Sequence, residues 1–523
     1  MLNFLTITEA HRGLIAKKFT VFELVQSCLD RIKVTDSYVN SFLTVRSLEE
    51  LMPEIKHAQK RIDSGDYTRI TGIPYSAKDL FCTEGIRTTA SSKILEDFYP
   101  TYESTVTQRL KEAGAIMIGK TNLDEFAHGS STETSAYKIS RTPWDTKRNA
   151  GGSSGGSGSS VAAHQCIFSV GTSTAGSIQN PSSMCGITGL KGTYGRVSRY
   201  GVIAMGSSLD SPGPMCKTVE DTAIVLEIIA GYDKKDSTTS TRKIESYSNL
   251  NRDTLRGLRI GVPKSYIATE MQNGVKRNTL NAIEKLEELG AKIVEIDLLK
   301  PDYATAVYTI LCRSEVSSNL SRYDGIRYGN QPNSENSTTI YEYIKKARSE
   351  NGFGLEAKRR IMTGTFALSV GYSKKYYEQA QKVRTLIIED FKKAFKKVDI
   401  MLSPTTPNTA DLIGGALANP LYGELADIFA CGIAVAGLPA ITVPSGFVNG
   451  LPTGLQLFGP HFSEKLCLEV AKVYQDNTEW HRKIPQLGVN SAKRGIDKGQ
   501  KFRSSGSLPN GKSLNSNPAG GDK

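Results

Sequence analysis

The chain has 523 residues, of which 39% are hydrophobic and 23% are charged, with a formal net charge of +12 at pH 7. These values are typical of globular proteins and exclude a minimal domain. No uncharged apolar run approaches the ~18–20 residues that span a bilayer, so we expect no membrane segment. The first thirty residues resemble neither a signal peptide nor a presequence, which favours the cytoplasm, with the mitochondrial matrix as the alternative.

Much of the positive charge lies at the C-terminal end. Residues 490–523 hold seven Lys or Arg against two Asp and are rich in Ser, Gly, Asn and Pro. Because such a segment cannot bury enough apolar surface to fold, we predict a disordered basic tail over 486–523, after one domain over 1–485. The charge left on that domain is mild and does not by itself indicate nucleic-acid binding.

The eight cysteines and six histidines form no CxxC, HExxH or HxH pattern. We therefore expect no metal site in this chain. The cysteines are predicted to be reduced, mostly buried thiols in a reducing compartment.

Helical and strand patterns alternate along the chain. Apolar residues at helical spacing predict two helices within residues 6–33, the second capped by Thr20 with Glu23 three positions later. The later predicted elements are a strand at 72–78, a helix at 105–114, a strand at 115–118, a helix at 217–231, a strand at 258–262, a helix near 274–289, a strand near 292–297, and a hairpin of 440–444 with 454–458 around Asn449-Gly450. This alternation predicts an α/β sheet with helices on its faces.

Residues 114–121 match the phosphate-loop pattern GxxxxGK[ST]. A phosphate loop needs a strand before it, a flexible loop within it and a helix after it. Here the preceding residues are helical and the middle four are predicted to be a strand. We therefore expect no nucleotide site at this place.

Two glycine- and serine-rich loops, Gly151–Ser157 and Gly171–Ser177, flank the uncharged apolar segment 161–170. Gly/Ser runs are usually flexible linkers, but here apolar residues follow at once. Glycine permits positive φ angles and lets the backbone approach a substrate closely. Two such loops around a buried element can bring serine hydroxyls and backbone N–H groups together, as acyl transfer at a serine requires.

A serine nucleophile needs a base, and no histidine lies in an obvious motif near either loop. Most lysines are solvated surface charges. Lys78, however, ends an apolar strand and precedes Leu80-Phe81. Burial there would lower its pKa, and a neutral lysine can act as a general base for serine.

These segments resemble the amidase-signature hydrolases, whose members use a Lys–cis-Ser–Ser triad. The resemblance covers about residues 5–483, and it includes both loops, the segment 186–191, and the spacings of 75 and 24 residues between Lys78, Ser153 and Ser177. The resemblance implies a single large domain with a central mixed β-sheet covered by helices on both faces. Four further stretches are similar to the glutamine-hydrolysing A subunits of tRNA-dependent amidotransferases: residues 119–126, 193–201, 317–325 and 358–361.

The resemblance also implies roles for individual residues. Ser177 would attack the carboxamide carbon, and Ser153 would pass the proton between Ser177 and Lys78, supported by Ser154. The peptide bond between Gly152 and Ser153 is expected to be cis. The remaining implied residues are the oxyanion-hole N–H groups of Thr174, Ala175 and Gly176, with that of Ser177, and the glutamine-binding residues Arg360, Asp427 and Tyr308.

By the same resemblance, the chain would hydrolyse L-glutamine and supply ammonia for conversion of Glu-tRNA(Gln) to Gln-tRNA(Gln). Its partners would be B and C subunits in a heterotrimer, with the tRNA bound mainly through the B subunit. ATP and magnesium would belong to that B subunit, so no cofactor is expected in this chain.

The second loop departs from the family pattern at three positions. Ser173 replaces an Asp, Ala175 replaces a Gly and Gln179 replaces an Arg. Loss of Asp and Arg together is expected if they form one ion pair, and a methyl at Ala175 would crowd the oxyanion. Two alternatives therefore stay open: a free-standing amidase of the same family, and a catalytically weakened assembly subunit.

Overall fold

One mixed β-sheet of eleven strands runs through the part of the chain that this computed structural model describes, residues 1–487 without 333–336, 338, 350–351 and 420. In sheet order the strands are β1 (Phe42–Val45), β3 (Ile116–Thr121), β2 (Pro74–Lys78), β4 (Phe168–Ser173), β6 (Ser211–Cys216), β5 (Thr188–Lys191), β10 (Ala440–Val448), β11 (Leu451–Phe458), β9 (Ile400–Pro404), β7 (Arg259–Pro263) and β8 (Lys292–Ile296). β2 is parallel to β3 and β4, and β7 is parallel to β8 and β9, whereas the other pairs are antiparallel. The predicted mixed sheet is confirmed.

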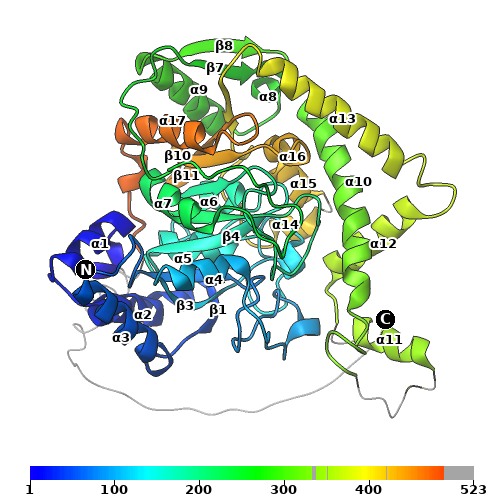
Figure 1. Cartoon of the computed structure of the whole chain (residues 1–523). Helices are drawn as coiled ribbons and strands as arrows, with labels where there is room; N and C mark the ends of the chain where they lie inside the picture. Colours follow the sequence, from blue (N-terminus) through cyan, green and yellow to red (C-terminus); the bar gives the residue numbers. More distant parts are fainter. Residues whose placement is uncertain (333–336, 338, 350–351, 420, 488–523) are drawn as a thin grey trace, which may run out of the picture. The chain divides into compact units, whose positions relative to one another are not determined.

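Helices cover both faces of this sheet (Figure 1). They are α1 (Ile7–Ile15), α2 (Val21–Val39), α3 (Leu48–Ser64), α4 (Thr105–Glu112), α5 (Gly155–Ala162), α6 (Gln179–Cys185), α7 (Val219–Ile229), α8 (Lys264–Ala268), α9 (Asn273–Glu288), α10 (Pro301–Asn319), α11 (Ile340–Ser349), α12 (Leu355–Leu368), α13 (Tyr377–Ala394), α14 (Gly415–Ala418), α15 (Tyr422–Ala426), α16 (Ile428–Val435) and α17 (Glu464–Asp476). One large hydrophobic cluster includes side chains of α1, α2, α7 and α17. A second includes those of α10, α12, α13 and α16.

The helix predicted to begin after Thr20 does so. The Thr20 side chain accepts a hydrogen bond from the Glu23 N–H, and the Glu23 carboxylate accepts one from the Thr20 N–H at 2.8 Å. This reciprocal pair satisfies two of the donors that every helix N-terminus leaves free. A small polar residue three positions before a Glu therefore located the helix start.

The parallel pairing of β2 and β4 positions the lysine. Ala77 lies opposite Val170 in this pair, and all five residues of β2 are buried. The carboxyl ends of parallel strands lie at the same edge of a sheet. Lys78, the last residue of β2, therefore lies beside the loop that follows β4.

The segment resembling a phosphate loop is strand β3. Its Lys120 is fully buried and forms an ion pair with Asp79, with Lys120 Nζ 3.1 Å from Asp79 Oδ1. The ammonium also donates to the Phe81 carbonyl at 2.8 Å and to Thr88 Oγ1 at 2.7 Å. The expected strand is confirmed, and this lysine holds the segment after β2 in place.

One expectation about the first glycine/serine loop is wrong. From Gly155 onward the run is not a loop but helix α5, buried along its whole length. Gly156 explains the choice of residue, because a Cβ there would lie 2.5 Å from the carbonyl oxygens of Asn122 and Ser41. Glycine and serine here permit close packing of a helix against its neighbours, which outweighs their low helix propensity.

The chain divides into two units, Met1–Gln486 and Leu487–Lys523. The basic tail predicted over 486–523 lies outside the described residues beyond Leu487.

All eight cysteines are free and buried, as predicted. Among the described residues, no helix is both long enough and apolar enough to cross a membrane.

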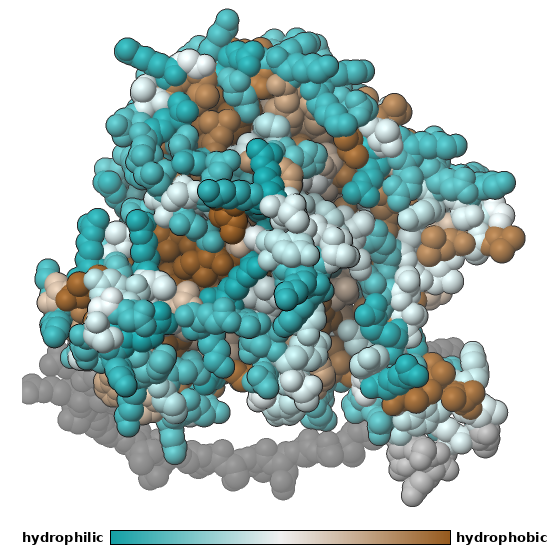
Figure 2. All heavy atoms as spheres, viewed as in Figure 1, coloured by the Kyte–Doolittle hydropathy of each residue, from teal (hydrophilic) through white to brown (hydrophobic). Residues whose placement is uncertain are grey.

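The face drawn in Figure 2 is largely hydrophilic, with brown patches where α12 meets α13 and over α11. Val370 is fully exposed between α12 and α13, and Ile340 at the start of α11 is 68% exposed. Phe366 and Leu368 near the end of α12 are also exposed. Exposed apolar patches of this kind often mark surfaces that partner chains cover.

Candidate active site

Lys78 and Ser153 form the centre of the candidate site. Lys78 Nζ lies 2.7 Å from Ser153 Oγ, and it also donates to Thr172 Oγ1 at 3.0 Å. Both side chains are fully buried. The peptide bond from Gly152 to Ser153 is cis, as expected. The strand end and the first loop therefore bring amine and hydroxyl into direct contact across 75 residues of sequence.

The Lys78 amine is poised to accept a proton. Burial lowers the pKa of Lys78 to about 7, while the carboxylates of Asp124 and Asp210 act in the opposite direction. A lysine with an ordinary pKa would hold its proton and could not act as a base near neutral pH.

Ser177 lies next to this pair in the turn between β4 and α6. Its carbonyl accepts a hydrogen bond from the Ser154 N–H at 3.2 Å, so the two predicted loops are in contact. The Ser154 hydroxyl donates to the Thr172 carbonyl at 3.1 Å, which ties the first loop to β4. Among the described residues, the Ser177 hydroxyl has no hydrogen-bond partner.

The four backbone N–H groups from Thr174 to Ser177 differ in their hydrogen-bond partners. Those of Thr174, Ala175 and Ser177 have no acceptor in the described part of the chain. The Gly176 N–H donates to Asp427 Oδ2 at 3.2 Å. Three of the four predicted oxyanion donors are thus unoccupied, and the fourth contacts a predicted substrate-binding residue.

Asp427 lies against the turn that carries Ser177. Besides the Gly176 N–H, it accepts a hydrogen bond from Asn180 Nδ2 at 3.2 Å, and Ser130 Oγ lies 3.2 Å from it. Burial raises the pKa of Asp427 to about 7, opposed by these hydrogen bonds. A cation beside this carboxylate would favour its charged form.

Arg360 lies on α12 and is 4% exposed. Its Nε donates to Glu356 Oε1 at 2.7 Å, whereas its terminal nitrogens have no hydrogen-bond partner among the described residues. Burial disfavours the charge, but the carboxylates of Glu424 and Glu356 raise the pKa of Arg360. Tyr308 on α10 is also buried, and burial raises its pKa while the charge of Arg360 acts in the opposite direction.

A cavity of about 790 Å³ opens between Arg360 and Ser130. Its other walls include Gly129, Tyr422 and Gly423. Ser130 links the cavity to Asp427, and Asp427 links it to the turn of Ser177. Arg360 therefore lines the cavity, whereas Asp427 and Ser177 lie outside its lining and are connected to it through the hydrogen bonds of Ser130 and Gly176.

Ser173 and Gln179 contact each other, as their joint departure from the family pattern suggests. Ser173 Oγ lies 2.8 Å from Gln179 Oε1 and 2.9 Å from the Ala175 carbonyl. Both side chains are fully buried. The Ala175 side chain belongs to a hydrophobic cluster, so its methyl group packs in the core.

This contact leads to a prediction about stability. Ser173→Asp alone should destabilise the protein by about 3 kcal/mol, because a buried carboxylate would lie against the Ala175 carbonyl without a cation to pair with. Adding Gln179→Arg should recover about 2 kcal/mol or more, since the new pair compensates the charge. Thermal unfolding of both single variants and the double variant measures this coupling. An additive double variant would show that the two positions do not act as a pair.

Sequence reasoning missed Asp210, whose carboxylate accepts a hydrogen bond from the turn that carries Ser177. Thr174 Oγ1 donates to Asp210 Oδ1 at 2.8 Å. Asp210 also accepts the N–H groups of Met205 and Gly206 at 2.9 and 3.2 Å. Burial raises the pKa of Asp210 to about 6, opposed by these bonds. An aspartate directly before a strand, here β6, is the only sequence signal for it.

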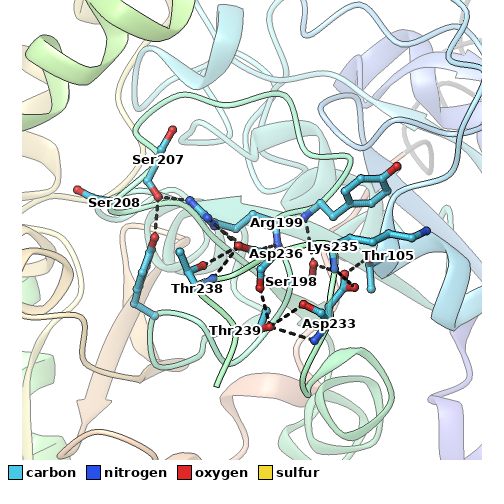
Figure 3. A network of polar contacts seen from close by, with 12 residues as sticks. Thr105, Ser198, Arg199, Ser207, Ser208, Asp233, Lys235, Asp236, Thr238 and Thr239 are labelled. Carbon is cyan, nitrogen blue, oxygen red and sulfur yellow. Dashed lines mark hydrogen bonds and ion pairs between the residues drawn. The ribbon is translucent and has the colours of Figure 1, made fainter. Parts of the chain in front are cut away.

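The segment that leads to Asp210 is fixed by the polar network of Figure 3. Arg199 donates to both carboxylate oxygens of Asp236, at 2.7 and 3.1 Å, and also to the Ser207 carbonyl. Ser198 and Thr105 both donate to Asp233 Oδ2, at 2.6 and 2.5 Å. The stretch 193–201, singled out in the sequence, therefore supports the site and does not line it.

No group of three or more His, Cys, Asp or Glu suited to a metal ion occurs within the described residues. The groups that the site offers for chemistry are a buried lysine, two serines and unoccupied backbone N–H groups. Such an arrangement can form and break an acyl ester.

Known proteins share this fold and sequence pattern. The family model described as Amidase matches residues 23–468. A protein of Chloroflexus aggregans, named as the A subunit of glutamyl-tRNA(Gln) amidotransferase, is 47% identical over 487 residues, which cover 93% of this chain and 99% of that relative. A protein of the same name from Vesicomyosocius okutanii is also 47% identical, over 92% of this chain and 99% of its own length.

Two solved structures are similar along nearly the whole chain. The crystal structure of the A subunit of glutamyl-tRNA(Gln) amidotransferase from Thermotoga maritima has a TM-score of 0.78 and 36% identity, covering 93% of this chain and 98% of that one. The native peptide amidase from Stenotrophomonas maltophilia has a TM-score of 0.78 and 27% identity, covering 92% and 98%.

Proposed function

Since the chain belongs to the amidase family, we propose that it is the A subunit of a glutamyl-tRNA(Gln) amidotransferase, the subunit that hydrolyses glutamine. The observation that carries the proposal is the buried contact of 2.7 Å between Lys78 Nζ and Ser153 Oγ beside the turn of Ser177. The A-subunit relatives that match almost end to end supply the substrate class.

In the first half of the reaction, Ser177 Oγ attacks the carboxamide carbon of glutamine. Its proton passes to Ser153, whose own proton passes to the neutral Lys78 amine. The N–H groups of Thr174, Ala175 and Ser177 receive the developing oxyanion, and losing one such donor typically costs ~2.7–4 kcal/mol. The same relay returns the proton to the leaving nitrogen, which departs as ammonia.

The second half runs the relay again with water. Water attacks the glutamyl ester on Ser177 while its proton moves through Ser153 to Lys78. Collapse of the oxyanion releases glutamate and restores the Ser177 hydroxyl. Atoms balance, since glutamine and water become glutamate and ammonia.

Glutamine is selected through the charges of its α-carboxylate and α-ammonium groups. Arg360 has free terminal nitrogens at the cavity, among the described residues, and binds the α-carboxylate, with Tyr308 beside it. Asp427 binds the α-ammonium and lies one hydrogen bond from the turn of Ser177. An uncharged amide would leave both groups buried and unpaired, a penalty that discriminates strongly.

Arg360→Ala should raise the KM for glutamine by roughly 30-fold, corresponding to about 2 kcal/mol of lost charge-assisted bonding. Hydrolysis of butyramide, which has no carboxylate, should change much less. Steady-state ammonia release on both amides measures the difference.

Arg359→Ala is the matched control. Arg359 precedes Arg360 on the same helix, is also paired to Glu356, and has a side chain that is 31% exposed. Arg359 also lines the cavity, so this variant tests whether the glutamine KM depends on Arg360 in particular or on any positive charge there. The KM should stay within about threefold of wild type, since a partly exposed ion pair contributes little. Equal losses on glutamine and butyramide in Arg360→Ala, or faster turnover of butyramide than glutamine by the wild type, would favour a free-standing amidase.

The names of the relatives imply a complex with other subunits of the same enzyme. We propose B and C subunits in a heterotrimer, with Glu-tRNA(Gln), ATP and magnesium bound mainly or entirely by the B subunit. The exposed apolar side chains around Val370 and Ile340 support a partner surface there. The buried free thiols suit a reducing compartment, and we propose the cytoplasm.

Co-expression with candidate B and C subunits tests this assignment. The purified complex should hydrolyse glutamine and convert Glu-tRNA(Gln) to Gln-tRNA(Gln) when ATP and magnesium are added. Failure to form the complex, with amidase activity retained, would indicate the free-standing enzyme. A complex that accepts free ammonia but not glutamine would indicate a catalytically weakened assembly subunit.

A further inference from the structure

Glu125 is a buried carboxylate that the mechanism does not use. It is 1% exposed and begins the short helical turn η3 (Glu125–Ala127) shortly after β3. The preceding residue, Asp124, is tied to the catalytic loop, since its N–H donates to the Ser153 carbonyl at 3.3 Å. Glu125 therefore lies one residue from a direct contact with the triad.

Both oxygens of Glu125 contact the start of α12. The Gly354 N–H lies 2.8 Å from Oε2 and 3.1 Å from Oε1, and Ser92 Oγ donates to Oε1 at 2.5 Å. Gly354 is the N-cap residue of α12 and has no side chain to cap the helix itself. A carboxylate at a helix N-terminus accepts a hydrogen bond from a free N–H group and interacts favourably with the positive end of the helix dipole. Glu125 therefore caps α12 from a distant part of the sequence.

The contact leaves no room for a side chain at position 354 unless one of the two partners shifts. A Cβ built there would lie 2.6 Å from Glu125 Oε2, closer than real Cβ atoms approach an oxygen. A larger residue would displace either the helix start or the Glu125 carboxylate, and either movement would lengthen the contact. The pair thus holds the first turn of α12 against the segment that follows β3.

Arg360 lies six residues further along the same helix, about 9 Å along its axis at 1.5 Å per residue. Its guanidinium is held on that helix by Glu356, one turn before it. A shift of the helix start would therefore move Arg360 and its partner together relative to Asp427 and Ser177.

We propose that Glu125 is a positioning residue for substrate binding, holding α12 so that Arg360 meets the α-carboxylate of glutamine. The proposal rests on the proposed function, in which Arg360 binds that carboxylate. Through Asp124 and Ser153, the same short segment holds the catalytic loop, so one stretch of chain sets the spacing between chemistry and substrate recognition.

Glu125→Gln in the full-length chain with its co-expressed partners tests this. Gln keeps only one of the two acceptor oxygens that face the Gly354 N–H and removes the negative charge from the helix N-terminus, so the glutamine KM should rise about tenfold while kcat stays within about threefold. Inactivation by phenylmethanesulfonyl fluoride, an uncharged reagent for the Ser177 hydroxyl, should keep its wild-type rate. Gly354→Ala should reproduce the same pattern, and it carries the test if Glu125→Gln does not fold.

Glu464→Gln is the matched control. Glu464 is also fully buried and accepts one backbone N–H, that of Thr193 at 2.8 Å, on another helix. It should leave the glutamine KM unchanged. An unchanged KM in Glu125→Gln and Gly354→Ala, or equal losses in glutamine hydrolysis and sulfonyl fluoride inactivation, would overturn the proposal as a merely structural contact.

Arg360→Ala in the same assay distinguishes a failure of the positioning role of Glu125 from a failure of the proposed carboxylate-binding site. If it raises the glutamine KM while Glu125→Gln does not, only the positioning role fails. If Arg360→Ala itself leaves the KM unchanged, the assignment of the carboxylate site fails, and the positioning role fails with it. The double variant Glu125→Gln/Arg360→Ala should have the same glutamine KM as Arg360→Ala alone. That result would support both the positioning role of Glu125 and the binding role of Arg360.

Discussion

Ser177→Ala is expected to lower glutamine hydrolysis by roughly 10⁴-fold or more while leaving the fold unchanged. The variant removes only the hydroxyl that forms the ester, and in the structure that hydroxyl has no hydrogen-bond partner among the described residues. The cost in stability should therefore be well under about 1 kcal/mol. Ammonia release and thermal unfolding measure the two effects.

Ser182→Ala is the control for this substitution. Ser182 is a buried serine of the same helix region, and its hydroxyl donates to the Ile178 carbonyl at 2.7 Å. Its loss should leave turnover within about threefold. Wild-type ammonia release by Ser177→Ala would exclude this serine as the nucleophile.

Lys78→Met is expected to lower kcat by about 10³-fold, within the range that general acid–base groups contribute. Methionine fills a similar volume but cannot accept a proton. The wild-type kcat/KM should rise as pH increases through about 7, because the pKa of Lys78 is lowered to about 7 and only its neutral form is a base. The variant should lack this rise.

Lys191→Met is the matched control. Lys191 is a buried lysine on β5 whose pKa burial lowers to about 8, and its ammonium donates to the Leu438 carbonyl at 3.0 Å. This variant should keep the wild-type pH profile. A flat wild-type profile between about pH 6 and 8, or recovery of Lys78→Met merely by raising the pH, would show that Lys78 is not the base.

Local patterns in the sequence indicated a candidate base and two candidate loops for a serine nucleophile, and the resemblance to the amidase-signature hydrolases then selected Ser153 and Ser177 within those loops. A charged residue at the end of an apolar strand indicated Lys78, and the two glycine-rich loops indicated where serine hydroxyls could meet it. The alternation of helices and strands predicted the sheet. The parallel pairing of β2 with β4 brings Lys78 and the two loops together. Local sequence patterns do not specify this pairing.

The supporting residues were not accessible in the same way. Asp210, Glu125 and Asn180 act through contacts across long sequence separations, and nothing in their immediate neighbours distinguishes them from ordinary polar residues. Helix α5 was missed because glycine and serine have low intrinsic helix propensity, and only close packing against other segments explains their use there. Local patterns predicted the chemistry, whereas tertiary packing determines what supports it.

The most direct test is to trap the ester that the mechanism requires. The full complex is mixed with glutamine, quenched in acid within the first turnover, digested and analysed by mass spectrometry. We predict that the peptide containing Ser177 gains the mass of one glutamyl residue, and that Ser177→Ala shows no such gain. Glutamine hydrolysis without an adduct on that peptide, or with the adduct on another residue, would contradict the account.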